Sequence, residues 1–126
     1  MSYMAVVLTE ESHNHLVATF EHMCAADGRG WKTFAHHLTM HMGKAKEEEQ
    51  VLIGEFATLV VDAVAGNEMV KAVRVVLPEE IQTKNDVPHI TLAVNVAGGG
   101  KPFFSNKLTD WEPVEPITLR GRVEEV

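Results

Sequence analysis

The sequence repeats one short pattern: a histidine, any residue, a threonine and an apolar residue. The two copies are His37-Leu38-Thr39-Met40 and His89-Ile90-Thr91-Leu92. Each lies in an apolar, β-branched run that predicts a strand, and residues two apart in a strand point to the same face. Each face therefore carries an imidazole beside a hydroxyl. Two such pairs suit metal-free cleavage of a phosphodiester, because one imidazole can act as base, the other as acid, and the hydroxyls can hold the phosphate.

Alternation along the first motif strand, expected over residues 34–42, sorts the neighbouring histidines. His41 shares the face of His37, so it could contact a substrate. His36 falls on the opposite, mostly apolar face, and we expect it at the edge of the core. If the two motif faces oppose each other across a cleft, His37 and His89 bracket a phosphate between them.

Other strands and helices must hold these motifs in place. Residues 4–8 predict a first strand, and apolar residues at helical spacing predict an amphipathic helix of about four turns that ends near Asp27-Gly28. Thr9 or Ser12 can cap the start of this helix. Further strands are expected over residues 51–64, 69–77, 89–96 and 117–126, the first two as a hairpin around Gly66-Asn67, with a short helix over residues 105–111.

Together these elements predict an α+β fold. Strands joined by hairpins favour antiparallel pairing, and two strands with the same motif suggest two small sheets related by a rough twofold. The sheets would form a central cleft, with one main helix and a short second helix beside them. At 126 residues the chain is too short for two ordinary domains, so we expect a single domain over residues 1–126.

Composition narrows the classes of protein. The formal net charge of −7 argues against an extended nucleic-acid-binding face, which is normally basic, but it leaves room for a small substrate or a strand end. No apolar run reaches the roughly 18 residues of a membrane span, and the N-terminal stretch does not read as a signal peptide. Cys24 is the only cysteine, which excludes an internal disulfide and a cysteine-based zinc site. A reducing cytoplasm is the expected location.

The paired motifs resemble those of the 2H phosphoesterase superfamily, whose mark is two His-x-Thr/Ser-x motifs. The order of parts is similar too: a strand and a helix precede the first motif, a β-rich middle separates the motifs, and a short helix and a strand follow the second. Residues 31–111 most resemble the small RNA-repair-like (Swiss Army Knife RNA repair-like) branch. The segments that carry this likeness are Gly100-Lys101-Pro102 and Ser105-Asn106-Lys107-Leu108. The short separation of the motifs would make this a compact member.

The resemblance implies an activity and a role for each motif residue. Members open cyclic phosphates or cleave 2′,5′-type phosphodiesters without a metal or cofactor. Their substrates include RNA 2′,3′-cyclic phosphate ends, ADP-ribose cyclic phosphate and cyclic oligonucleotides. By motif position His37 and His89 would be the acid and the base, in either order. Thr39 and Thr91 would bind the non-bridging phosphate oxygens. The implied partner is a nucleotide or RNA-end substrate, with no membrane involved.

Four further side chains are candidate substrate contacts. Trp31 and Phe103 could stack on a nucleobase, although core packing or loop anchoring is the commoner role of such rings. Lys101 follows three glycines that let the backbone approach a ligand closely, so it is the best candidate for a cation near the phosphate. A solvated surface charge is the commoner role of a lysine. His41 completes this set.

Two other classes of function fit the same residues. His37, His41 and His89 could form a three-histidine metal site. Residues four apart on a regular strand lie roughly 13 Å apart, however, at ~3.3 Å per residue, so one ion cannot join His37 and His41 without a sharp bend. The chain could also be a non-catalytic module that binds a nucleotide or an RNA end. Turnover that needs a divalent ion would favour the metal site, and tight binding without turnover would favour the module.

Overall fold

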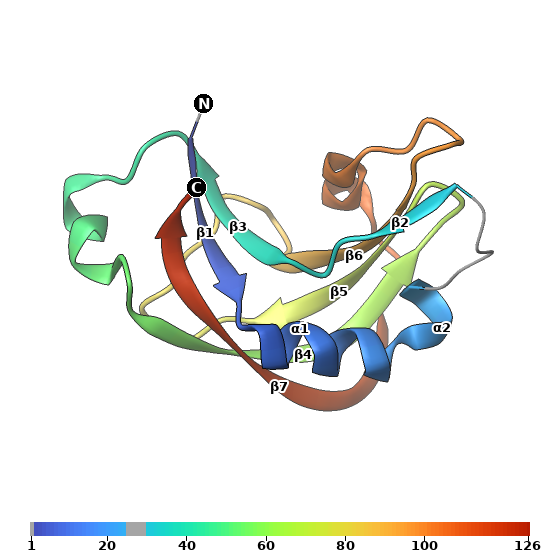
Figure 1. Cartoon of the computed structure of the whole chain (residues 1–126), viewed down its shortest axis with the longest axis horizontal. Coiled ribbons are helices and arrows are strands. Elements are labelled where there is room, and N and C mark those ends of the chain that lie inside the picture. The colour runs from blue at the N-terminus through green and yellow to red at the C-terminus, as the bar shows by residue number, and fades with distance from the viewer. Residues whose placement is uncertain (1, 25–29) are drawn as a thin grey trace.

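A computed structural model describes residues 2–24 and 30–126 of the chain (Figure 1). Strands dominate the fold. They are β1 (Tyr3–Leu8), β2 (Trp31–Thr33), β3 (His37–Met42), β4 (Phe56–Gly66), β5 (Val70–Val76), β6 (His89–Asn95) and β7 (Glu112–Glu125). The α-helices are α1 (Glu10–Thr19) and α2 (Glu21–Cys24), and the short 3₁₀ helices are η1 (Glu47–Leu52) and η2 (Pro102–Lys107).

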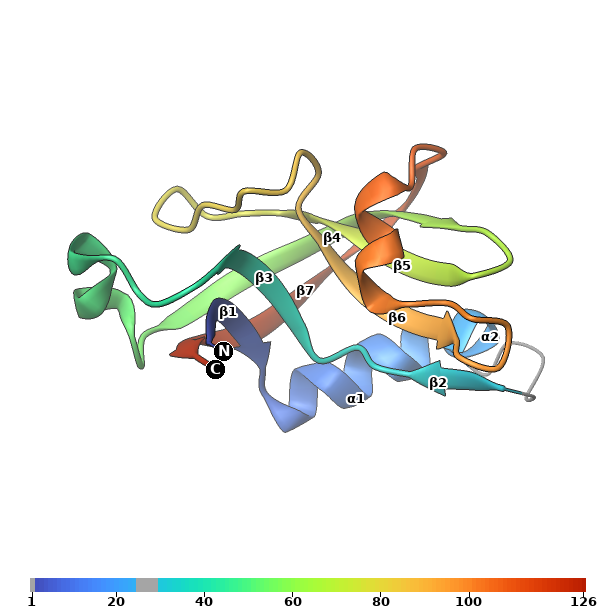
Figure 2. The ribbon, with the colours of Figure 1, turned by 90° about the horizontal axis from the view of Figure 1, so that it is seen from above.

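Within the described residues, six strands close into an antiparallel barrel (Figure 2). The order around the ring is β6-β3-β1-β7-β4-β5, and β5 pairs again with β6 to complete it. β2 precedes β3 and pairs with the far end of β6. Each strand of the ring has a neighbour on both sides, so closure removes the free edges that an open sheet would present.

The expected α+β fold, with two small sheets around a central cleft, is therefore wrong. The alternation of apolar and polar residues predicted most of the strands, including the hairpin of β4 and β5. This pattern indicates which face of a strand is apolar, but it does not indicate which strands pair with one another. The long β7 pairs with β1 and β4, and β5 pairs with β4 and β6. These shared strands join what were expected to be two sheets into one.

The apolar core fills the inside of the ring. Its largest fully buried side chains include Met4, Leu38, Leu59, Ile90 and Leu119. Leu16 of helix α1, and Phe20 directly after this helix, belong to the same cluster. Burying each such side chain stabilises the fold by about 1.5–3 kcal/mol relative to exposure, so the inward-facing side chains drive closure of the ring.

The N-terminal helix is divided at Phe20. Thr9 caps α1 as expected, because its hydroxyl accepts a hydrogen bond from the Ser12 N–H (3.1 Å). α1 ends before Phe20 and α2 starts after it, so the expected main helix of about four turns is two shorter helices. The expected end of that helix at Asp27-Gly28 lies outside the described residues. No helix in the described ranges combines the length and the apolar character that crossing a membrane requires.

A kink at Ala35 separates β2 from β3. Ala35 is buried and adopts a left-handed φ of 49°, which residues other than glycine rarely adopt. Its N–H donates to the Thr91 carbonyl (2.9 Å), and Nδ1 of His13 in α1 donates to the Ala35 carbonyl (2.8 Å). The strand expected over residues 34–42 therefore begins only at His37.

We expect His13→Ala to weaken the fold. The substitution removes the bond to the Ala35 carbonyl, so the free energy of unfolding should fall by about 1 kcal/mol. Urea denaturation followed by circular dichroism measures this change. His15→Ala is the matched control, because His15 is exposed on the same helix and the change in helix propensity is the same. Equal free energies of unfolding for the two variants would show that His13 does not support the kink.

Candidate active site

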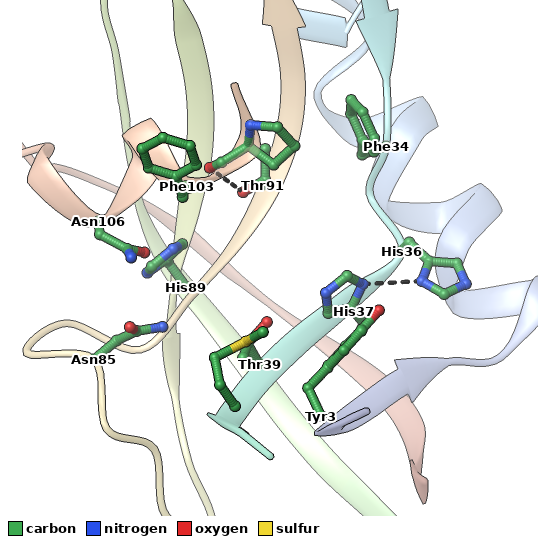
Figure 3. Close-up of a pocket in the computed structure, with 12 residues that line it drawn as sticks. Tyr3, Phe34, His36, His37, Thr39, Asn85, His89, Thr91, Phe103 and Asn106 are labelled. Carbon is green, nitrogen blue, oxygen red and sulfur yellow. Dashed lines mark hydrogen bonds between the residues drawn. The ribbon is translucent and has the colours of Figure 1, made fainter. Parts of the chain in front are cut away.

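Both motifs line one cavity of about 310 Å³ (Figure 3). His37 and Thr39 come from β3, and His89 and Thr91 come from β6. In Figure 3 these side chains surround the same space. The other lining residues are Tyr3, Phe34, His36, Met42, Asn85, Pro102, Phe103 and Asn106. The structure thus brings together the four residues that the repeated motif predicts.

The pairing of β3 with β6 explains this arrangement. The two strands are antiparallel neighbours, with Leu38 opposite Ile90. In this antiparallel register His37 comes opposite Thr91, and Thr39 comes opposite His89. Each motif histidine therefore lies across from the threonine of the other motif. The motif faces were expected to oppose each other from two sheets. They instead lie side by side on neighbouring strands of one sheet, related by a local twofold between Leu38 and Ile90.

His37 is half-buried and is held through one ring nitrogen. Its Nδ1 lies 2.9 Å from Nδ1 of His36, and its Nε2 points into the cavity (Figure 3). The Tyr3 ring packs against it, with the ring centroids 5.4 Å apart. Desolvation by burial, and then the neighbouring charge of His36, lower the pKa of His37 from 6.5 to about 4. His37 is therefore neutral near pH 7 and able to accept a proton.

His89 is held by the main chain. The side chain is buried, with 7% of the residue exposed. Its Nδ1 lies 2.7 Å from the Val87 carbonyl, and a carbonyl can only accept, so Nδ1 carries the proton of this bond. This tautomer leaves Nε2 as the nitrogen that can exchange a proton with a bound molecule.

The two motif threonines have different surroundings. Thr91 Oγ1 lies 2.8 Å from Ser105 Oγ and 3.4 Å from the Pro102 carbonyl, both in η2. Ser105 is 1% exposed, so it supports the Thr91 hydroxyl from the protein side. For Thr39, the main-chain carbonyl accepts a bond from the Thr83 hydroxyl (2.8 Å), which ties the loop before β6 to β3. η2 and this loop thus each support one motif threonine.

His41 lies outside the cavity, although alternation predicted that it shares the face of His37. β3 carries one extra residue relative to β1 after Thr39. Such a bulge breaks the alternation, so Met42 reaches the cavity instead. His41 Nε2 donates to a carboxylate oxygen of Glu49 (2.7 Å). The bond to the Met42 carbonyl, and then the bond to Glu49, raise the pKa of His41.

Of the other candidate substrate contacts, only Phe103 lines the cavity. Phe103 is 60% exposed, and its ring packs edge-on against the Phe104 ring, with the centroids 5.0 Å apart. Trp31 lies in β2 and packs on the core, with the Lys71 ammonium 5.0 Å from its ring centroid. Lys101 is exposed at the start of η2 and does not line the cavity. The structure therefore leaves Trp31 and Lys101 out of the site.

Sequence reasoning missed several lining residues. Tyr3, Phe34, Asn85 and Asn106 come from segments without a motif, and the fold alone brings them to the cavity. His36 was expected at the edge of the core, on the face away from His37. The kink at the preceding residue turns it to the cavity instead, where it is exposed. The pair of adjacent histidines is the only sequence signal for its place there.

The side chains of the cavity are mostly neutral. No lysine, arginine or carboxylate lines it among the described residues, so histidines, hydroxyls and amides are the polar groups available.

The three-histidine metal site is not assembled, because His41 lies elsewhere. The described part of the chain holds no other group of three or more His, Cys, Asp or Glu side chains arranged for a metal ion. The arrangement fits acid–base chemistry on a small ligand.

Residues 3–121 match the family described as the fungal tRNA ligase phosphodiesterase domain. No curated protein and no solved structure gives a match. This family is a 2H phosphoesterase-type domain, so the superfamily resemblance of the two motifs is confirmed, and it supports a cyclic phosphodiesterase activity on RNA ends. The narrower RNA-repair-like branch stays a prediction. Because the match includes both motifs and nearly all of the sequence, the chain belongs to the fungal tRNA ligase phosphodiesterase domain family.

Proposed function

We propose that the chain is a metal-independent enzyme that hydrolyses a 2′,3′-cyclic phosphate, or a 2′,5′-type phosphodiester, at the end of an RNA or on a nucleotide. The observation that carries this proposal is the convergence of two His-x-Thr motifs on one cavity. Family membership supports the reaction class and the RNA-end substrate. The two-histidine mechanism and the identity of its residues are our inference from the geometry.

His37 is the general base in this mechanism. Its Nε2 faces the cavity and its lowered pKa keeps the ring neutral near pH 7. Nε2 takes a proton from a water molecule as the water oxygen attacks phosphorus. A base with a pKa near 4 is weak, but the negative charge of a bound phosphate favours the protonated ring and raises its pKa toward the working pH.

His89 is the general acid. Its Nδ1 proton is committed to the Val87 carbonyl, so the proton that it can give up sits on Nε2. The bond between phosphorus and a ribose oxygen breaks, and His89 protonates that oxygen as it leaves. One proton is taken from water and one is given to the leaving oxygen. The products are a phosphate monoester and a free ribose hydroxyl.

The threonine hydroxyls bind the phosphate. Thr39 and Thr91 donate to the two non-bridging oxygens. Thr91 Oγ1 can accept from the Ser105 hydroxyl, and its own proton, which the structure directs along a long contact to the Pro102 carbonyl, turns to the ligand when the phosphate binds. Because no lysine or arginine lines the cavity in the described chain, protonated His89 is the positive charge nearest the phosphate. A singly charged cyclic phosphodiester suits such a site better than a triphosphate.

Removing either histidine should abolish turnover. We expect His37→Ala and His89→Ala each to lower kcat by ~10²–10⁴-fold, the usual cost of losing a general acid or base. The assay measures hydrolysis of 2′,3′-cyclic nucleotides and of RNA with a 2′,3′-cyclic phosphate end, in excess EDTA. Products separated by their 2′- or 3′-phosphate show which ribose oxygen leaves.

His41→Ala is the matched control for this experiment. His41 lies on the same strand as His37 but faces Glu49, outside the cavity, so its loss should leave kcat unchanged. Activity that appears only with a divalent ion would overturn the metal-free mechanism. Tight binding of the cyclic ends without hydrolysis would point instead to a binding module.

The pH dependence should reveal the neutral base. Because kcat/KM reports the free enzyme, its acidic limb should be centred near pH 4, where His37 becomes protonated, and not near 6.5. Activity is therefore retained as the pH falls from 7 to about 5 and is lost below that. Circular dichroism at each pH shows that the protein stays folded. An acidic limb near pH 6.5 would mean that His37 is not the base.

A further inference from the structure

We propose that His36 is a positioning residue that holds His37 in the tautomer required of a general base. This inference rests on the proposed function, which assigns the base role to His37. His36 lies outside both motifs. Alternation along the strand had predicted that it faces away from His37.

The short contact between His36 and His37 is a hydrogen bond, so only one of the two Nδ1 atoms carries a proton. The Nδ1 atoms lie 2.9 Å apart, with the ring planes at 81° to each other. Two bare nitrogens would repel through their lone pairs, and two protonated ones would repel through their protons, so one Nδ1 must donate and the other must accept. The contact therefore has two forms, which differ in the histidine that donates.

The two forms differ in what His37 presents to the cavity. If His36 donates, the proton of neutral His37 sits on Nε2, and Nε2 cannot take one from water. If His37 donates, its Nε2 carries a lone pair that faces the cavity (Figure 3). Only the second form is a base.

The second form also suits the reaction as it proceeds. When His37 gains a proton on Nε2, its Nδ1–H becomes a cationic donor to the His36 Nδ1, and such charge-assisted bonds are stronger than neutral ones. In the first form, proton uptake would need a rearrangement of the shared proton. His36 thus does for His37 what the Val87 carbonyl does for His89.

The contact between His36 and His37 depends on an irregular backbone conformation at Ala35. In a regular strand, His36 and His37 would point to opposite faces. The left-handed Ala35 turns His36 toward the cavity, and the His36 carbonyl accepts a bond from the Leu8 N–H (2.9 Å), which fixes the main chain there. A left-handed alanine is the kind of local strain that persists where the surrounding structure holds it.

Among the described residues, His36 is the side chain that makes this contact with His37. The ionisable side chains that line it beside His37 are Tyr3, His36 and His89, and no carboxylate is among the described lining residues. A catalytic histidine is usually oriented by a carboxylate or a carbonyl. Among the bonds of the described residues, His36 is the partner of the His37 Nδ1.

The tautomer can be read directly. Two-bond ¹H–¹⁵N NMR spectra distinguish Nδ1–H from Nε2–H histidines without any substrate. For His37 near pH 7 we expect Nδ1–H in the native protein and a shift toward Nε2–H in His36→Ala. His36→Asn should restore Nδ1–H, because the asparagine side-chain oxygen can take the place of the accepting Nδ1. His15→Ala, on exposed helix surface, should leave the spectrum unchanged.

Kinetics supply the second readout. We expect His36→Ala to lower kcat by roughly 10–100-fold, as loss of an outer-shell partner does elsewhere, with KM within about twofold. His36→Asn should recover most of kcat. A native His37 in the Nε2–H form, or an unchanged kcat in His36→Ala, would overturn the proposal. If the native protein hydrolyses none of the cyclic phosphates, the proposed function fails, and the NMR spectra still decide whether His36 sets the tautomer.

Discussion

Leu38 and Ile90 face each other across β3 and β6, and this register constrains the rest of the site. Both of these apolar side chains point into the core. The histidine and threonine that flank each of them on its strand therefore point to the outer face of the sheet. A slip of one residue would send the motif side chains inward and the apolar ones into the cavity. The closed ring prevents such a slip, because β3 is also paired with β1 and β6 with β5.

Two departures from regular strand geometry flank the first motif. A left-handed residue precedes it at Ala35, and a bulge follows Thr39. Both change which side chains face the cavity: the kink adds His36, and the bulge replaces His41 with Met42. Irregularities of this kind often lie beside active sites, because they re-aim side chains that a regular strand would direct elsewhere.

The electrostatics of the cavity follow from its neutral lining. A phosphate site usually draws on lysine or arginine, yet the described lining residues include neither. Burial lowers the pKa of His37 to about 4, so this ring is uncharged near pH 7 and adds no positive charge to the cavity. The net charge of −7 lies elsewhere on the chain, because the described residues that line the cavity include no carboxylate.

The sequence alone identified the two motifs, most strands, the β4–β5 hairpin and the Thr9 helix cap. These features depend on periodicity and on hydrogen bonds within a few residues, which a sequence displays directly. Only the tertiary structure decided that the strands close into one ring, because the choice of strand partners depends on contacts distant in sequence. It also decided that His36 faces the cavity and that His41 does not. Each outcome depends on one irregular backbone position, and a single such residue reverses the face that alternation predicts.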